Sequence, residues 1–92
     1  MATAGLELEV IATADAWILV TADGEQAYSG FVRKGERRTW RADNRIGLRT
    51  GNAGGTSVTL NGNRLSTLGD SGEVHEREWR LLANGDIEER TL

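Results

Sequence analysis

The single histidine of the chain, His75, is the side chain best suited to acid–base or metal chemistry. It stands between Glu73 and Glu76, two carboxylates that could join it at a metal. No second histidine and no cysteine is present to complete a zinc site, so a solvated charged face explains the stretch better. Four serines could act as nucleophiles, and none stands in a strained Gly-x-Ser-x-Gly elbow: Ser29, Ser57, Ser66 and Ser71. We predict no enzymatic activity, no metal and no cofactor.

A glycine-rich stretch, Gly51-Asn52-Ala53-Gly54-Gly55, could cradle a phosphate with successive backbone N–H groups. A phosphate-binding loop of this kind continues with Lys-Ser or Lys-Thr, and that pair is missing here. The Gly-x-Gly-x-x-Gly spacing is missing as well. We therefore predict a turn whose Gly and Asn residues adopt left-handed conformations.

The tryptophans are the remaining candidates for chemistry, because each is a large apolar surface with one polar group. Trp17 lies in an apolar run and is predicted to be core, whereas Trp40 and Trp79 lie among charged residues. One of these two is expected to be partly exposed with an arginine stacked on it. The predicted partner contacts are Trp40, Tyr28, Trp79 and whichever of Ile18 or Val20 faces outward.

The composition is that of one small folded domain spanning residues 1–92, with a net charge of −3. That charge argues against nucleic-acid binding, which needs a cationic face, and the basic cluster at 33–41 reads as solvated strand edges. No cysteine is available for a disulfide. The uncharged apolar run at 16–22 is far shorter than the ~20 residues of a membrane-spanning helix, so an anchor would lie elsewhere in a parent protein.

Alternating apolar and polar residues, separated by Gly, Asn and Asp turns every 8–12 residues or so, predict an all-β fold. Asp23-Gly24 and Asn61-Gly62 are typical of type I′ hairpin turns, and Lys34-Gly35-Glu36 is a third turn. We predict an antiparallel β-sandwich or a partly open barrel of about seven short strands. The expected strands are 6–10, 17–21, 26–32, 37–41, 45–49, 56–60 and 64–65.

The last fifth of the chain is ambiguous. Residues 73–83 are mostly good helix formers, yet neither a helical stripe nor a strand face is clean, so helix and strand both stay open. Residues 83–92 would add a hairpin strand across Asn84-Gly85 or form a frayed tail.

The order of several short segments resembles the C-terminal domain of RodZ-type cell-shape proteins. The first part is Trp17, Val20 and the Asp23-Gly24 turn, followed by Gly30, the Lys34-Gly35-Glu36 turn and Trp40. The more specific part is 48–55 followed by 58–62, then Leu65, Leu68-Gly69 and Ser71-Gly72-Glu73-Val74, with Gly69 and Gly72 as turn residues. The resemblance covers roughly residues 6–79 and favours a strand over 73–81.

The resemblance implies a β-rich domain on the extracytoplasmic side of the bacterial membrane. Such proteins carry a cytoplasmic helix-turn-helix domain that binds the actin-like protein MreB, then a membrane helix and a linker. The whole links the cytoskeleton to peptidoglycan synthesis, so the expected partners are proteins of the elongation machinery or peptidoglycan. Two alternatives remain: a carbohydrate-binding module gripping glycans through Trp40 or Trp79, and a self-association module pairing edge strands.

Overall fold

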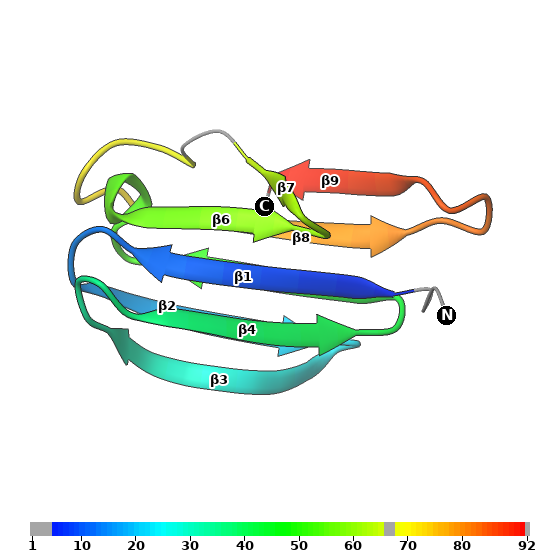
Figure 1. The fold of residues 1–92 in the computed structure, drawn as a ribbon, viewed down its shortest axis with the longest axis horizontal. Coiled ribbons are helices and arrows are strands. Elements are labelled where there is room, and N and C mark those ends of the chain that lie inside the picture. The colour runs from blue at the N-terminus through cyan, green and yellow to red at the C-terminus, as the bar shows by residue number, and fades with distance from the viewer. Residues whose placement is uncertain (1–4, 66–67, 92) are drawn as a thin grey trace.

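The computed structural model describes residues 5–65 and 68–91, which form nine strands and one short 3₁₀ turn (Figure 1). In order these are β1 (Leu6–Ala12), β2 (Ala16–Ala22), β3 (Glu25–Val32), β4 (Arg37–Ala42), β5 (Arg45–Thr50), η1 (Ala53–Gly55), β6 (Thr56–Leu60), β7 (Asn63–Arg64), β8 (His75–Leu81) and β9 (Ile87–Thr91). The described residues contain no helix with the length and apolar character that crossing a membrane requires.

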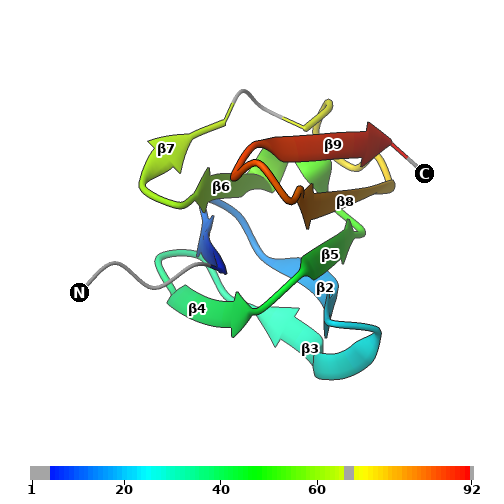
Figure 2. The same cartoon turned by 90° about the vertical axis from the view of Figure 1, so that its right-hand side faces the viewer.

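The strands form two antiparallel sheets that pack face to face, and the end-on view of Figure 2 shows the two layers. One sheet has four strands in the order β4-β1-β6-β7 and the other has five in the order β3-β2-β5-β8-β9. The sheets do not close into a barrel, so the sandwich alternative is confirmed. The two strands beyond the predicted seven are β8 and β9, which fall in the segments left open by the sequence.

Period-2 alternation places one face of each central strand in the core. In β1 the inward side chains are Leu6, Leu8 and Val10, all at most 2% exposed, while the residues between them are half-buried. The facing sheet contributes β2, β5 and β8 side chains to the same apolar layer. The large side chains that complete it are Ile18, Val20, Val32, Ile46, Leu48, Val58, Leu60, Leu68 and Trp79.

The two predicted type I′ hairpin turns are confirmed. Asp23 and Gly24 have φ values of 52° and 86°, and Asn61 and Gly62 have 50° and 81°. Asp23 does more than turn the chain, because its carboxylate accepts hydrogen bonds from the backbone N–H groups of residues 43, 44 and 45 at 2.7–3.1 Å. These bonds lower the pKa of Asp23 below its ordinary value. The β2–β3 turn is thereby tied to the β4–β5 turn.

The prediction of left-handed residues in Gly51–Gly55 is wrong. None of Gly51, Asn52, Gly54 and Gly55 has a positive φ, and the segment forms the 3₁₀ turn η1. Two of its glycines are needed for close approach instead: a Cβ on Gly54 would lie 2.7 Å from the backbone carbonyl carbon of Asp70. A Cβ on Gly55 would lie 2.6 Å from the side-chain amide nitrogen, Nδ2, of Asn52.

Within the ambiguous region 73–83, residues His75–Leu81 form the strand β8, which pairs with β5 and with β9. Gly85, with φ of 90°, allows the turn that brings β9 back alongside β8, so the extra hairpin strand is present. Of the two turn glycines in the preceding loop, Gly72 has a positive φ of 81°. Gly69 does not, and it is instead packed against the His75 ring, 2.6 Å from where a Cβ would lie.

Candidate functional site

Three of the predicted partner contacts lie in the core and cannot meet a partner. Ile18 and Val20 are both 0% exposed, because they share the inward face of β2 and neither faces outward. Trp79 is 1% exposed and packs inward from β8, opposite Ile46 of β5. Its charged sequence neighbours point to the other face of the sheet, which is why they misled the prediction.

Tyr28 and Trp40 are half-buried and close one side of the sandwich, where the edge strands β3 and β4 face each other. Their ring centroids are 5.5 Å apart at an interplanar angle of 44°. The Arg38 guanidinium lies over the Tyr28 ring, 4.8 Å from its centroid. An arginine does stack on an aromatic ring here, but the ring belongs to Tyr28 and not to a tryptophan.

Tyr28 also reaches along β3 and covers Gly30. A Cβ on Gly30 would lie 3.2 Å from the Tyr28 hydroxyl, and that hydroxyl donates a 2.9 Å hydrogen bond to the Phe31 carbonyl oxygen. Glu36 holds Arg38 in place at 3.1 Å, and the hydrogen bond from the Arg33 N–H, aided by the charge of Arg38, lowers the pKa of Glu36. The main role of the cluster of Tyr28, Trp40, Arg38 and Glu36 is therefore structural: it covers the open side of the core between β3 and β4.

The exposed aromatic side chains are Trp17 and Phe31, and the sequence prediction missed both. They lie directly opposite each other on β2 and β3. Trp17 is 36% exposed and Phe31 is 65% exposed, so the prediction of Trp17 as core is wrong. In the structure Ala16 and Ile18 on either side of Trp17 face inward, so alternation along β2 turns Trp17 outward.

A continuous row of apolar and small residues runs across this outer face; we call it the outer row, and it consists of Phe31, Trp17, Gly51 and Val74. Gly51 follows β5 beside Trp17 and donates its N–H to the Trp17 carbonyl oxygen at 2.8 Å. Extending the β5–β8 register by one residue places Val74, which is 60% exposed, opposite Gly51.

A polar row lies next to the outer row on the same face of the five-stranded sheet. Its members are Ser29, Arg49 and Glu76. Ser29 and Arg49 both pair with Leu19 of β2, which lies between them, and Arg49 pairs with Glu76. No ion pair within 4.0 Å joins Arg49 to Glu76, a statement that covers residues 5–65 and 68–91. Both charged groups are thus available beside the apolar surface.

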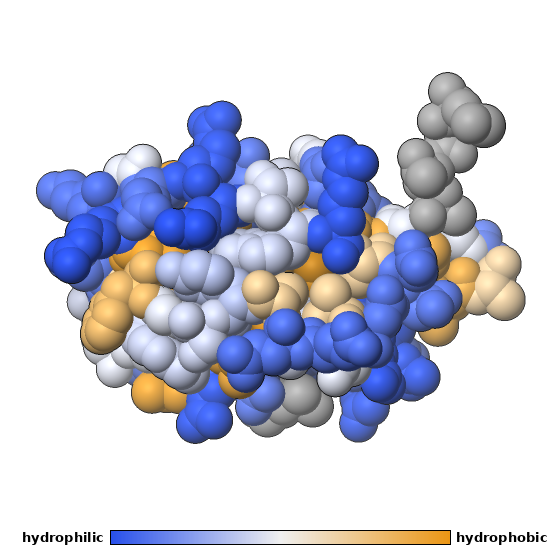
Figure 3. All heavy atoms as spheres, turned by 90° about the horizontal axis from the view of Figure 1, so that it is seen from below, coloured by the Kyte–Doolittle hydropathy of each residue, from blue (hydrophilic) through white to orange (hydrophobic). Residues whose placement is uncertain are grey.

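Figure 3 views the molecule from the side of β3 and β4, the edge strands that carry Phe31, Tyr28 and Trp40. Pale and orange side chains occupy much of this side, and blue, hydrophilic side chains border them (Figure 3). The apolar and weakly polar side chains on this side are therefore bounded by hydrophilic ones (Figure 3).

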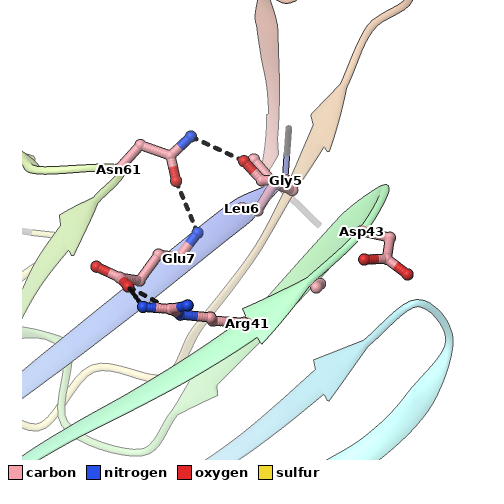
Figure 4. Close-up of a pocket in the computed structure, with 7 residues that line it drawn as sticks. Gly5, Leu6, Glu7, Arg41, Asp43 and Asn61 are labelled. Atoms are coloured by element: carbon pink, nitrogen blue, oxygen red, sulfur yellow. Dashed lines mark hydrogen bonds and ion pairs between the residues drawn. The ribbon is translucent and has the colours of Figure 1, made fainter. Parts of the chain in front are cut away.

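A hollow of about 420 Å³ lies at the start of β1, and its lining groups are drawn in Figure 4. Glu7 and Arg41 form an ion pair of 2.8 Å there. The Asn61 side chain accepts a 2.6 Å bond from the Glu7 N–H and donates a 3.2 Å bond to the Gly5 carbonyl (Figure 4). These polar groups bind one another, so we interpret the hollow as a junction between strands and not as a ligand site.

His75 and the carboxylates beside it in the sequence do not form a metal-binding or acid–base cluster in the described part of the chain. His75 Nε2 lies 3.7 Å from Glu73 Oε1, and that oxygen also accepts a 2.7 Å hydrogen bond from the Asp70 N–H. Within the described part of the chain, no group of three or more His, Cys, Asp or Glu side chains could hold a metal ion. Ser66 lies outside the described residues.

The fold and surface define a two-sheet β-sandwich domain whose most exposed aromatic side chains lie on an outer sheet face. A family profile of the RodZ C-terminal domain matches residues 9–77, three quarters of the chain, and the chain therefore belongs to that family. The family is a non-enzymatic domain of a cell-shape protein. Searches of curated proteins and of solved structures found no significant match.

Proposed function

We propose that this chain is a non-catalytic interaction domain of a membrane-anchored bacterial cell-shape protein, placed on the extracytoplasmic side of the membrane. In this role it links the cytoskeleton to peptidoglycan synthesis by docking proteins of the elongation machinery or the wall itself. Membership of the RodZ C-terminal domain family supports the proposal. The docking surface is the β2–β3 half of the outer face of the five-stranded sheet.

The observation that carries this choice is the exposed Trp17–Phe31 pair. Aromatic side chains on a rigid sheet supply apolar contact area with little conformational entropy to lose, which is why they are enriched at interfaces. The inward face of β2 is already filled by Ala16, Ile18 and Val20, so Trp17 contributes nothing essential to the core.

The outer face of the four-stranded sheet offers no comparable surface. There Glu7 pairs with Arg41 at 2.8 Å and Glu9 with Arg37 at 3.7 Å, across the β1–β4 pair. Charges matched in this way stay hydrated and give little affinity to a partner. The aromatic side of the other sheet is the better docking surface.

The test is the shape of rod-forming cells whose only RodZ-type protein carries this domain with Phe31→Ser. Phe31 is more exposed than Trp17, so its replacement should leave folding intact. We expect shorter and wider cells at unchanged protein level. Leu82→Ser is the matched control, because Leu82 is 40% exposed and lies in the β8–β9 turn. Normal rods from cells with the Phe31 variant would place the docking surface elsewhere.

A photoreactive phenylalanine analogue at position 31 identifies what docks. Irradiation should attach position 31 to an elongation protein or to wall material, whereas the same analogue at position 82 should attach to neither. Equal capture from both positions would mean non-specific contact and would refute the assignment of the docking surface.

A further inference from the structure

The outer row has a flat interruption at Gly51 that folding does not demand. Gly51 has no positive φ, and a Cβ added there would meet only ordinary contacts, 3.7 Å from the Trp17 carbonyl oxygen and 3.9 Å from Trp17 Cβ. A larger residue would therefore fit. Because Gly51 has no side chain, the outer row is open at this position, between its neighbours Trp17 and Val74 on the adjacent strands.

The exposed apolar area is too small for a stable contact with a second copy of the chain. Side chains of this size carry roughly 150–250 Å² of surface, so the exposed fractions of Phe31, Trp17 and Val74, 65%, 36% and 60%, together leave about 300 Å². A stable protein interface takes about 800 Å² from each partner, of which the apolar part is roughly 450–520 Å². An occupant that is narrow and extended suits the outer row better.

The polar row indicates the chemistry of that occupant. Arg49 can only donate hydrogen bonds and ionised Glu76 can only accept them, and the hydroxyl of Ser29 does both. A ligand that meets all three must carry several groups that donate and accept. Sugar hydroxyls do this, and the C–H face of a pyranose ring packs against the negative face of an aromatic ring.

We propose that the outer row binds a saccharide chain, with a sugar ring seated over Gly51 against Trp17 and its hydroxyls bonded to Arg49 and Glu76. This inference rests on the proposed function and names the ligand class of the same surface. The outer row takes the place of Trp40 and Trp79, the glycan contacts expected from the sequence. Trp79 is buried, and Trp40 packs against Tyr28 at the side of the sandwich.

The test is a titration of the isotopically labelled domain, followed through the indole N–H signals of its tryptophans. The probes are N-acetylglucosamine tetramer and muramidase-released peptidoglycan fragments. The indole signal of Trp17 should shift saturably with at least one probe, while the signal of buried Trp79 stays still.

Gly51→Thr should weaken the binding at least tenfold, because the new side chain fills the seat, and Val74→Ser should weaken it less. Leu82→Ser should leave it unchanged. Thermal melts check that each variant folds, and Val74→Ser keeps the test valid should Gly51→Thr unfold. No shift of Trp17 with millimolar amounts of either probe would overturn the proposal.

Two further results would overturn the saccharide while leaving the proposed function standing. One is capture of an elongation protein, and not wall material, by the analogue at position 31 together with flat titrations. The other is a Trp17 shift that grows with domain concentration in the absence of sugar, which would identify a second copy as the occupant. Normal cell shape with Phe31→Ser would instead refute the docking surface on which both the proposed function and this inference rest.

Discussion

Gly54→Ala is the substitution from which we expect the clearest loss of stability for the smallest chemical change. The added Cβ would collide with the backbone nitrogen of Ser71 and lie 2.7 Å from the carbonyl carbon of Asp70. These backbone atoms cannot move away freely. The Gly54 N–H donates to the Asp70 carbonyl at 3.0 Å, and the Ala53 N–H donates to the Glu73 carbonyl at 2.8 Å.

The magnitude follows from three opposing effects. Overpacking of this kind costs about 1–3 kcal/mol, and each hydrogen bond stretched or lost adds about 0.5–1.5 kcal/mol. Restricting the unfolded chain returns about 0.4–1 kcal/mol. The net loss in the free energy of unfolding is then about 1–3 kcal/mol, which lowers Tm by roughly 5–20 °C in a domain of this size.

Gly51→Ala is the matched control, three residues away in the same glycine-rich stretch. Its Cβ would make only ordinary contacts at 3.7 Å or more, so we expect a change in stability within about 1 kcal/mol. Thermal and urea unfolding followed by circular dichroism measure both variants. Equal Tm values for the two would refute the claim that close approach to the 70–73 loop requires Gly54.

Three further predictions use the same unfolding measurements. The urea midpoint should fall as pH drops below about 3.9 through the lowered pKa of Asp23, because its ionised carboxylate accepts the three backbone hydrogen bonds more strongly than the protonated group does, and Asp23→Asn should flatten that decline. Tyr28→Phe should lower the free energy of unfolding by about 0.5–1.5 kcal/mol through loss of the bond to Phe31; an unchanged value would contradict the bond's role. Trp79→Ala should cost about 3–5 kcal/mol and Trp17→Ala about 1 kcal/mol, and similar losses would mean that both are core.

Much of the fold follows from the sequence because the decisive signals are local. The alternation Leu6-Glu7-Leu8-Glu9-Val10 defines which face of β1 is buried. Asp-Gly and Asn-Gly pairs each need two positive φ values, which fixes two hairpins. The order of the motifs then points to the RodZ C-terminal domain family, and the profile match confirms it.

The site could not be predicted as well, because exposure in a sheet depends on the partner strands. Trp79 stands between Glu78 and Arg80, yet neighbours along a strand face opposite sides and say nothing of its own environment. Trp17 stands in a run that is apolar on both faces, so the run alone does not reveal which face is covered. The structure settles the matter, because Ile18 and Val20 fill the inward face of β2 and Trp17 lies on the opposite face beside Phe31.

The end of β3 indicates how a ligand would be recognised there. Three polar backbone groups at this end, one in β3 and two just after it, are already satisfied by side chains: the Phe31 carbonyl by Tyr28, the Arg33 N–H by Glu36 and the Lys34 N–H by Asp15. A strand that tried to add to this edge, from a second copy or a peptide, would have to break these bonds. This end of the β3 edge is thus unfavourable for backbone pairing while the Trp17–Phe31 face beside it stays open, so we expect recognition there to act through side chains.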